Sequence, residues 1–178
     1  PHIESGSVVF AGVDYHKILK AAEAEADVIL WDGGNNDLPF YKPDVHITVA
    51  DPLRPGHERR YHPGQSNFIM ADTIVINKVD SASPESIEQV RANIRALNPK
   101  ARVIEADSEI TLDTPIDLKG RKVLVVEDGP TLTHGEMPFG AGAVLAQRAG
   151  AVMVDPKPYA VGSINFTYQK YPHTRDIL

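Results

Sequence analysis

The sequence contains no cysteine, which excludes disulfides and thiolate metal sites and is typical of a cytoplasmic protein. It also lacks any apolar run long enough to span a membrane. Basic residues are few: 18 stand against 24 acidic ones, and the net charge of −6 argues against a nonspecific nucleic-acid binder. We therefore expect a cytoplasmic protein with no nucleic-acid or membrane partner.

The usual phosphate-binding loop of nucleotide-binding proteins is also missing. No Gly-x-x-x-x-Gly-Lys-[Ser/Thr] segment occurs, so nothing in the chain can wrap the β- and γ-phosphates of a nucleotide in the usual way. Either the chain is not a nucleotide-binding protein of this type, or the loop precedes Pro1. Because the chain opens without an initiator methionine, we expect a fragment of a longer polypeptide, called the full-length protein below.

What the chain does contain is an alternation of apolar strand patterns and amphipathic helix patterns. Its 178 residues, 42% of them hydrophobic and 24% charged, fit one globular domain over 1–178 with no internal boundary, and Pro115–Lys119 is the only candidate seam. We expect an α/β fold with a mainly parallel sheet. The expected strands are 7–11, 27–32, 44–51, 73–76, 102–106, 122–127 and 152–155. The expected helices are 14–26 with Asp14 as cap, 83–97 with Pro84 in its first turn, 140–149 and one beginning near 163, with an irregular stretch at 52–65.

The sequence Asn77-Lys78-Val79-Asp80 directly follows the apolar strand 73–76. In α/β proteins, ligands bind at the carboxyl ends of the strands, where this motif lies. The Asp80 carboxylate can accept two hydrogen bonds from a guanine edge, the Asn77 amide can meet the other side of the ring, and the Lys78 stem can lie across the base. The alternative is a strand that simply ends in a polar turn. The position after an apolar run favours a purine-base site.

Asp32 ends the expected strand 27–32 and is followed by Gly33 and Gly34. A carboxylate in this position can hold Mg²⁺ or its water, and glycines let a phosphate approach the backbone closely. The alternative is a glycine-rich turn with a capping aspartate. Together with the motif at 77–80, the pattern favours a magnesium site.

A loop at 51–64 concentrates three arginines and two histidines in an otherwise acidic chain. Forked guanidinium groups suit phosphorylated ligands, although such arginines also pair with surface carboxylates. We expect a substrate site in this loop, and the histidines lack a clear third ligand for a metal. The candidate residues are Arg54, His57, Arg59 and Arg60.

A further polar segment, 127–135, follows the expected strand 122–127 and precedes a helix that starts at Gly140. Free backbone amides at a helix N-terminus attract anions. Thr133 and His134 can add donors, and His134 can transfer a proton near neutral pH. The alternative is a glycine-rich loop packed for close approach of the helix.

These segments together resemble the cyclic 2,3-diphosphoglycerate synthetase family, an archaeal group often labelled as GTPase-like. The resemblance covers nearly the whole chain and rests on DVILWDGGNNDLPF (27–40), ADPLRPGHERRYHPG (50–64), ADTIVINKVD (71–80), VLVVEDGPTLTHG (123–135) and DPKPYAVGSI (155–164). Members of that family carry the phosphate-binding loop in an earlier segment. The resemblance therefore implies a three-layer α/β sheet of the P-loop NTPase type, present here as the C-terminal part without its P-loop.

The resemblance also implies an activity for the full-length protein: ATP- and Mg²⁺-dependent closure of the phosphoanhydride ring of 2,3-diphosphoglycerate, with negligible turnover by this fragment alone. The residues implied to bind Mg²⁺ are Asp32, Glu127 and Asp128. Those implied to hold the nucleotide are Gly33, Gly34, Asn77, Lys78 and Asp80. Those implied to neutralise the substrate phosphates are Arg54, His57, Arg59, Arg60, Thr133 and His134.

Other functions fit the same residues. The motif at 77–80 is enough for a GTPase that acts as a switch or a metallochaperone, and the absent loop is consistent with a non-catalytic α/β interaction domain. GTP fits as well as ATP, because Asp80 matches the guanine edge better than the adenine edge. A homodimer is compatible with the sequence.

Overall fold

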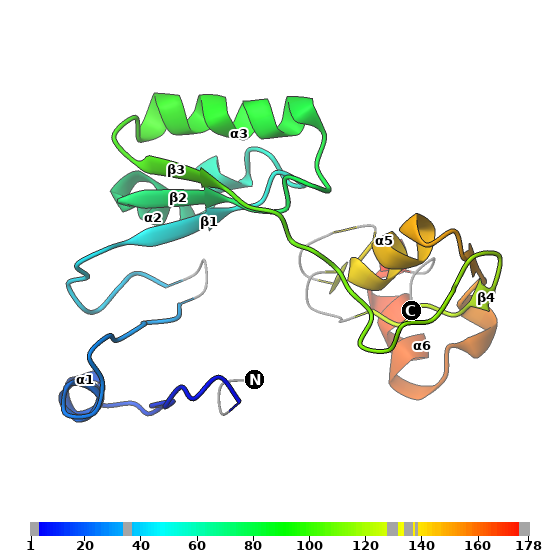
Figure 1. Ribbon diagram of the computed structural model, residues 1–178, viewed down its shortest axis with the longest axis horizontal. Helices are drawn as coiled ribbons and strands as arrows, with labels where there is room; N and C mark the ends of the chain where they lie inside the picture. The colour runs from blue at the N-terminus through cyan, green and yellow to red at the C-terminus, as the bar shows by residue number, and fades with distance from the viewer. Residues whose placement is uncertain (1–3, 34–36, 128–131, 134–136, 138, 175–178) are drawn as a thin grey trace. The chain divides into compact units, whose positions relative to one another are not determined.

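The computed structural model describes residues 4–33, 37–127, 132–133, 137 and 139–174. The chain divides into two units, Pro1–Ser108 and Glu109–Leu178 (Figure 1). The boundary falls shortly before Pro115–Lys119, the seam that the sequence indicated. Each unit has a parallel sheet of its own, one of three strands and one of two.

The first unit is built around a three-stranded parallel sheet in the order β1-β2-β3. Its elements are α1 (Tyr15–Glu23), β1 (Ile47–Ala50), η1 (His57–Arg59), α2 (Gly64–Met70), β2 (Thr73–Ile76), α3 (Pro84–Leu97) and β3 (Arg102–Glu105). The register pairs Ala50 with Ile76 and Ile76 with Glu105, so all three strands end at the same level. The segments that leave these strands therefore share one edge of the sheet.

Both α2 and α3 pack on the same face of this sheet. Ile74 and Ile76 of β2 are fully buried there against Phe68 of α2 and against Val90 and Ile94 of α3. In Figure 1, α2 lies behind the strands and α3 runs along their upper side. The opposite face carries the alternate side chains, because successive residues of a strand point to opposite sides.

The opposite face is apolar and largely exposed within the described part of the unit. Ile47, Val49 and Ile104 project on that side and keep 58%, 63% and 39% of their surface accessible. Parallel sheets normally carry a covering layer on each face. This face is therefore the side of the unit on which further packing is to be expected.

The second unit contains β4 (Lys122–Val123), α5 (Ala141–Arg148), β5 (Val152–Met153), η2 (Lys157–Tyr159), α6 (Gly162–Lys170) and η3 (Pro172–Thr174). The strands β4 and β5 pair in parallel, and α5 connects back to β5 through a short turn at Gly150. Ala146 of α5 and Tyr168 of α6 are buried. Among the residues that the structure describes, no helix is long and apolar enough to cross a membrane.

The α/β class and the parallel pairing of the strands are confirmed. The strand 73–76 and the helix 83–97 form as predicted, and Asp14 and Ser83 cap their helices through bonds to Lys17 N and Ser86 N. Two strand predictions are wrong: residues 7–11 and 27–32 have no regular structure. Most of their apolar side chains are exposed, and a strand without a neighbouring strand has no partner for its backbone hydrogen bonds.

The other differences concern length. The strands predicted at 122–127 and 152–155 are reduced to two residues each, and the helix predicted at 14–26 ends at Glu23. The stretch predicted to be irregular, 52–65, contains η1 and leads into α2, which the sequence analysis missed. Phe68, the buried anchor of α2, is the signal that could have revealed it.

Candidate functional site

The candidate site lies where β1 and β2 end. The Asn77 N–H donates to Ala50 O at 3.0 Å, which brings the residue after β2 against the residue that precedes Asp51. Lys78 then adopts a left-handed backbone conformation with φ of 60°, which is uncommon for a residue other than glycine. Its carbonyl accepts from the N–H groups of Ser81 and Ala82, so the motif forms a tight turn at the edge of the sheet.

Asp51 is the charged centre of this edge. Its Oδ2 lies 3.0 Å from Lys78 Nζ and 3.3 Å from Arg54 Nη2, and its Oδ1 accepts from Leu53 N at 3.0 Å. The Asp51 side chain is 18% exposed, which reduces screening of these ion pairs by water. The Asp51 carboxylate thus contacts residues of two segments that were predicted separately. One is Lys78 of the motif at 77–80, called the base motif, and the other is Arg54 of the loop at 51–64, called the arginine-rich loop. Asp51 was not among the predicted site residues, although it follows an apolar strand just as Asp32 was expected to.

The residues that follow β3 form hydrogen bonds with Val79 and Asp80 of the base motif. Val79 N donates to Ala106 O at 3.2 Å, and Asp80 Oδ1 accepts from Ser108 N at 3.1 Å. The second carboxylate oxygen of Asp80 accepts from Ser81 Oγ at 3.0 Å. Asp80 is exposed, so its carboxylate edge is accessible to a ligand that could replace these bonds. Asn77, Lys78 and Asp80 therefore lie in one turn at the end of β2, and their role in holding a base stays a prediction.

The arginine-rich loop is attached to α3 through Asn93. Asn93 is 6% exposed; its Oδ1 accepts from Arg59 Nη1 at 3.1 Å, and its Nδ2 donates to Glu58 Oε1 at 2.5 Å. Glu58 in turn accepts from Gly56 N through its other oxygen at 2.9 Å. Arg54 and Arg59 thus already have protein partners, on Asp51 and Asn93.

The remaining aromatic and basic side chains of the arginine-rich loop are those of His57, Arg60, Tyr61 and His62. The His57 ring lies edge-on to the Tyr61 ring, with centroids 5.3 Å apart. Arg60 is exposed, as are Tyr61 and His62. The loop therefore offers its surface cations to a ligand at residues 59–62 rather than at Arg54.

The predicted magnesium ligands are distributed over both units. Asp32 and Gly33 are exposed beside Trp31, whose ring is edge-on to Phe40, while Gly34 lies outside the described residues. Asp128 and His134 also lie outside them, and Thr133 follows the buried Leu132. Within the described ranges, no three His, Asp or Glu side chains gather as metal ligands. The magnesium site stays a prediction.

Glu127 has a different partner from the one predicted. Its Oε1 accepts from Ala143 N at 2.7 Å and its Oε2 from Gly142 N at 3.1 Å, so the carboxylate caps the N-terminus of α5. The anion attracted by these amides is therefore a side chain of the same unit. Both oxygens of Glu127 are used in this way, which leaves Asp32 as the exposed carboxylate among the described magnesium candidates.

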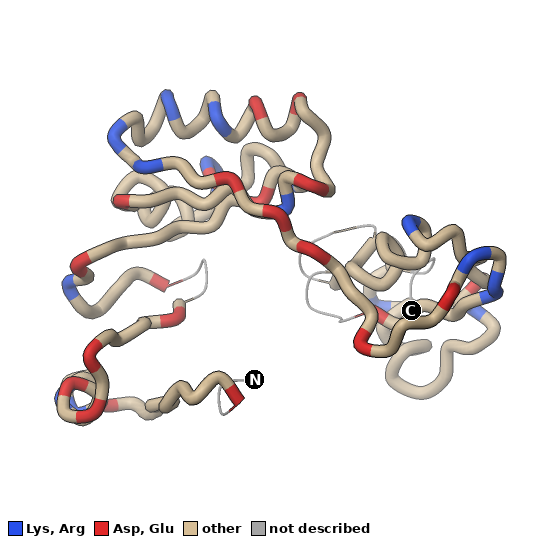
Figure 2. The backbone as a smooth tube through the Cα atoms, viewed as in Figure 1, with Lys and Arg blue, Asp and Glu red and all other residues tan. Residues whose placement is uncertain are grey.

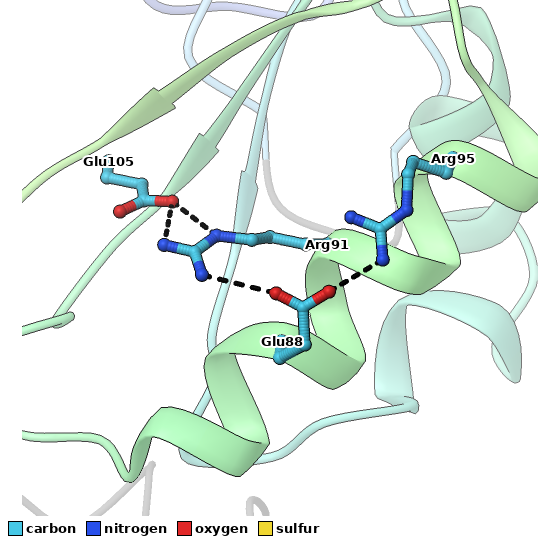
Figure 3. A network of polar contacts seen from close by, with 4 residues as sticks. All are labelled: Glu88, Arg91, Arg95 and Glu105. Carbon is cyan, nitrogen blue, oxygen red and sulfur yellow. Dashed lines mark hydrogen bonds and ion pairs between the residues drawn. The ribbon is translucent and has the colours of Figure 1, made fainter.

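A second polar feature lies between α3 and β3. A shallow hollow there is lined by Arg91, Ile94, Arg95, Val103 and Glu105. Its charges already pair with one another and with Glu88, as Figure 3 shows. Hydrogen bonds from Arg95 and Arg91 lower the pKa of Glu88, and the bond to Glu105 raises the pKa of Arg91. The hollow is therefore a structural ion-pair network rather than a free charged site.

The charged residues of α3 are ordered by sign along the helix. Figure 2 shows acidic residues in the first half of the helix and basic residues in the second half. This order complements the helix dipole.

Comparison with known proteins supports nucleotide binding. Residues 22–105 match the model of the CobW/HypB/UreG nucleotide-binding domain, which is less than half of the chain. The matched region includes the whole edge described above except Ala106–Ser108. No solved structure matches the chain.

Named relatives are synthetases. The chain is 62% identical over 179 residues to the arginine synthetase ArcE of Thermococcus kodakarensis, covering 100% of this chain and 40% of that protein. It is 30% identical over 130 residues to the cyclic 2,3-diphosphoglycerate synthetase of Thermococcus sibiricus, covering 70% of this chain and 29% of that protein. The synthetase of the same name from Pyrococcus furiosus is 24% identical over 96 residues, or 54% of this chain and 21% of that protein. The chain thus spans well under half the length of these relatives.

Proposed function

We propose that the full-length protein is a cytoplasmic, nucleoside-triphosphate-dependent synthetase and that the edge formed by β1 and β2 holds its purine base. The observation that supports this most directly is the turn at 77–80, with Asn77, Lys78 and Asp80 around one point at the carboxyl end of a parallel strand. The match of residues 22–105 to a nucleotide-binding domain agrees with it. The triphosphate would be bound by residues outside this chain.

Of the two products for which the relatives are named, we propose arginine. The arginine synthetase is similar over the whole chain at 62% identity, whereas the cyclic 2,3-diphosphoglycerate synthetases reach 30% over 70% of it. The geometry of the loop agrees with this choice. A pocket for a doubly phosphorylated substrate needs several free cations, but Arg54 is paired with Asp51, which leaves Arg59 and Arg60 as the exposed arginines of the loop.

The chemistry follows from the structure of arginine. A ureido precursor has an oxygen where arginine has its terminal nitrogen, and that oxygen is a poor leaving group. Its attack on the γ-phosphorus would break the bond to the β-phosphate oxygen and release the nucleoside diphosphate. Ammonia would then attack the ureido carbon, the carbon–oxygen bond would break, and phosphate would leave with the oxygen while a proton passes to water.

Within this scheme the residues of this chain have binding roles. Asp80 and Asn77 would orient the purine by hydrogen bonds, and the Lys78 stem would cover its face. Mg²⁺, when bound, would neutralise charge on the phosphates, and Asp32 is the exposed carboxylate that could hold it. ATP and GTP both remain in the proposal.

Formation of cyclic 2,3-diphosphoglycerate is the second candidate. It is supported by the motifs shared with that family and by the exposed side chains of Arg60 and His62. It uses the same nucleotide edge and differs in the acceptor, which would be a phosphate oxygen of 2,3-diphosphoglycerate.

One experiment separates these functions. The full-length protein is incubated with ATP or GTP and Mg²⁺, in one series with a ureido amino acid and ammonia and in another with 2,3-diphosphoglycerate. Amino-acid analysis detects arginine, and phosphorus NMR detects a cyclic phosphoanhydride. We expect arginine in proportion to nucleoside diphosphate. Nucleotide hydrolysis that neither acceptor changes would favour a GTPase switch or a metallochaperone, and the absence of nucleotide binding would refute the proposal.

A further inference from the structure

The strongest unassigned feature is the carboxylate of Asp51, which contacts two cations from different segments. One comes from the base motif, Lys78, and the other from the arginine-rich loop, Arg54. We propose that Asp51 is a positioning residue of the nucleotide site, which fixes the Lys78 side chain and couples it to Arg54. This inference rests on the proposed nucleotide site and adds a residue to it that need not touch the ligand.

Asp51 is itself held in a fixed orientation. Its Oδ1 accepts from Leu53 N at 3.0 Å, and its main-chain oxygen accepts from Arg54 N at 3.0 Å. The residue follows β1 directly, so its position is set by the parallel pairing of β1 with β2. Because the backbone on both sides is bonded, the second oxygen, Oδ2, presents a fixed acceptor to Lys78.

Lys78 needs such an acceptor. A lysine side chain has a flexible four-carbon stem, and ordering it costs conformational entropy. Lys78 starts from a left-handed backbone conformation, and its ammonium group reaches Oδ2 of Asp51 at 3.0 Å. With the two ends fixed in this way, the stem between them is ordered before a base arrives.

Arg54 is coupled through the same oxygen. Its Nη2 lies 3.3 Å from Oδ2, while its Nε is buried without a hydrogen-bond partner. Loss of the Asp51 charge would therefore leave a partly buried guanidinium without its carboxylate, a costly arrangement that favours a shift of the loop. Lys78 and Arg54 would then both lose the carboxylate that holds them in position.

The test measures nucleotide affinity in the full-length protein by titration calorimetry, with ATP and GTP in the presence of Mg²⁺. We expect Asp51→Asn to weaken binding of the preferred nucleotide about tenfold, because a charge-assisted hydrogen bond to Lys78 is lost. Asp51→Glu keeps the charge but displaces it by one methylene, and we expect roughly a threefold loss. Asp44→Asn, an exposed aspartate before β1, is the matched control and should leave affinity unchanged.

A second background distinguishes positioning from a general structural role. In a Lys78→Met protein, the lysine that Asp51 positions is gone, so Asp51→Asn and Asp51→Glu should weaken binding much less than they do in the wild type, and the remaining effect comes from Arg54. If the Asp51→Asn protein does not fold, the Asp51→Glu variant alone is compared with the wild type. Unchanged affinity of the Asp51 variants, or an equal loss with and without Lys78, would overturn the inference. If the wild type binds neither nucleotide, the proposed function fails first, and the inference fails with it.

Discussion

Asn98 shows how one side chain can join two elements. It follows α3, is 8% exposed, and donates through Nδ2 to Phe68 O at 3.1 Å and Ala71 O at 2.8 Å. We expect Asn98→Ala to lower the free energy of unfolding by about 2 kcal/mol, because two buried carbonyl groups lose their donor. Chemical denaturation measures this, with the exposed Asn165→Ala as control. A loss no larger than that of the control would mean that water replaces the amide.

Whether a residue's role could be predicted depends on how far along the chain its partner lies. Asp14 was expected to cap a helix, and its Oδ1 does accept from Lys17 N at 3.2 Å, only three residues away. Asp51 instead pairs with Lys78, 27 residues later in the sequence. No local pattern identifies such a partner. The base motif could therefore be predicted, whereas the carboxylate that anchors its lysine could not.

At the scale of elements, α5 depends on Glu127. An added Cβ at Gly140 would clash with Glu127 Oε2, so Gly140→Ala should displace the carboxylate from the α5 amides. We expect that change and Glu127→Ala each to cost about 1 kcal/mol of unfolding free energy. The double variant should also cost about 1 kcal/mol, because both changes remove the same cap.

Chemical denaturation of the four proteins tests this cycle. Additive losses would show that Gly140 is needed for another reason. The magnesium role predicted for Glu127 has its own readout: that role requires Glu127→Ala to change the Mg²⁺ dependence of the full-length protein, whereas a cap changes stability alone.

The contact between α3 and β3 gives a prediction about pH. Glu88 accepts from Arg95 Nη2 at 2.6 Å and from Arg91 Nη1 at 3.2 Å, and these bonds hold its pKa below the usual 4.5 (Figure 3). A carboxyl whose pKa is lower in the folded state stabilises the fold above its ordinary pKa and loses that effect as pH falls through the lowered value.

We therefore expect Glu88→Gln to lower the melting temperature slightly at pH 7, and the difference from the wild type to shrink as the pH falls from 4.5 toward 3. Thermal unfolding at pH 7 and across this range, with the exposed Glu23→Gln as control, checks this. The effect at neutral pH should also shrink in high salt, since all of these side chains are accessible to water. A gap that persists unchanged at pH 3 would contradict the ion-pair explanation.

Elements were predictable where their ends are marked locally. Ser83, Pro84 and Asn98 gave α3 its limits, and the helix forms between them. The apolar run at 27–32 looked equally clear but forms no strand, and Val28 and Leu30 are 74% and 88% exposed. A helix satisfies its backbone hydrogen bonds within itself, whereas a strand depends on a neighbour that the sequence pattern does not identify.

At the scale of the whole molecule, the predicted site assumed that every strand joins one sheet. The described residues instead form two sheets, β1-β2-β3 in the first unit and β4-β5 in the second. Residues from the first unit, such as Asn77 and Arg54, were grouped in the prediction with Glu127 and Thr133 of the second. Within the first unit, Arg54 and Lys78 follow two adjacent strands of one sheet and meet at Asp51.

The exposed apolar face of the first sheet leads to the last prediction. Parallel sheets are buried on both faces, yet Val49 is 63% exposed and Ile47 58% exposed on the side away from α2 and α3. We expect this face to be covered in the full-length protein, so that Val49→Lys there lowers the free energy of unfolding by roughly 2 kcal/mol or more. Val13→Lys, at a position 95% exposed outside any strand, is the matched control and should have almost no effect. Denaturation of both variants decides the matter: a tolerated lysine at position 49 would mean that the face stays open to water, contrary to the behaviour of parallel sheets.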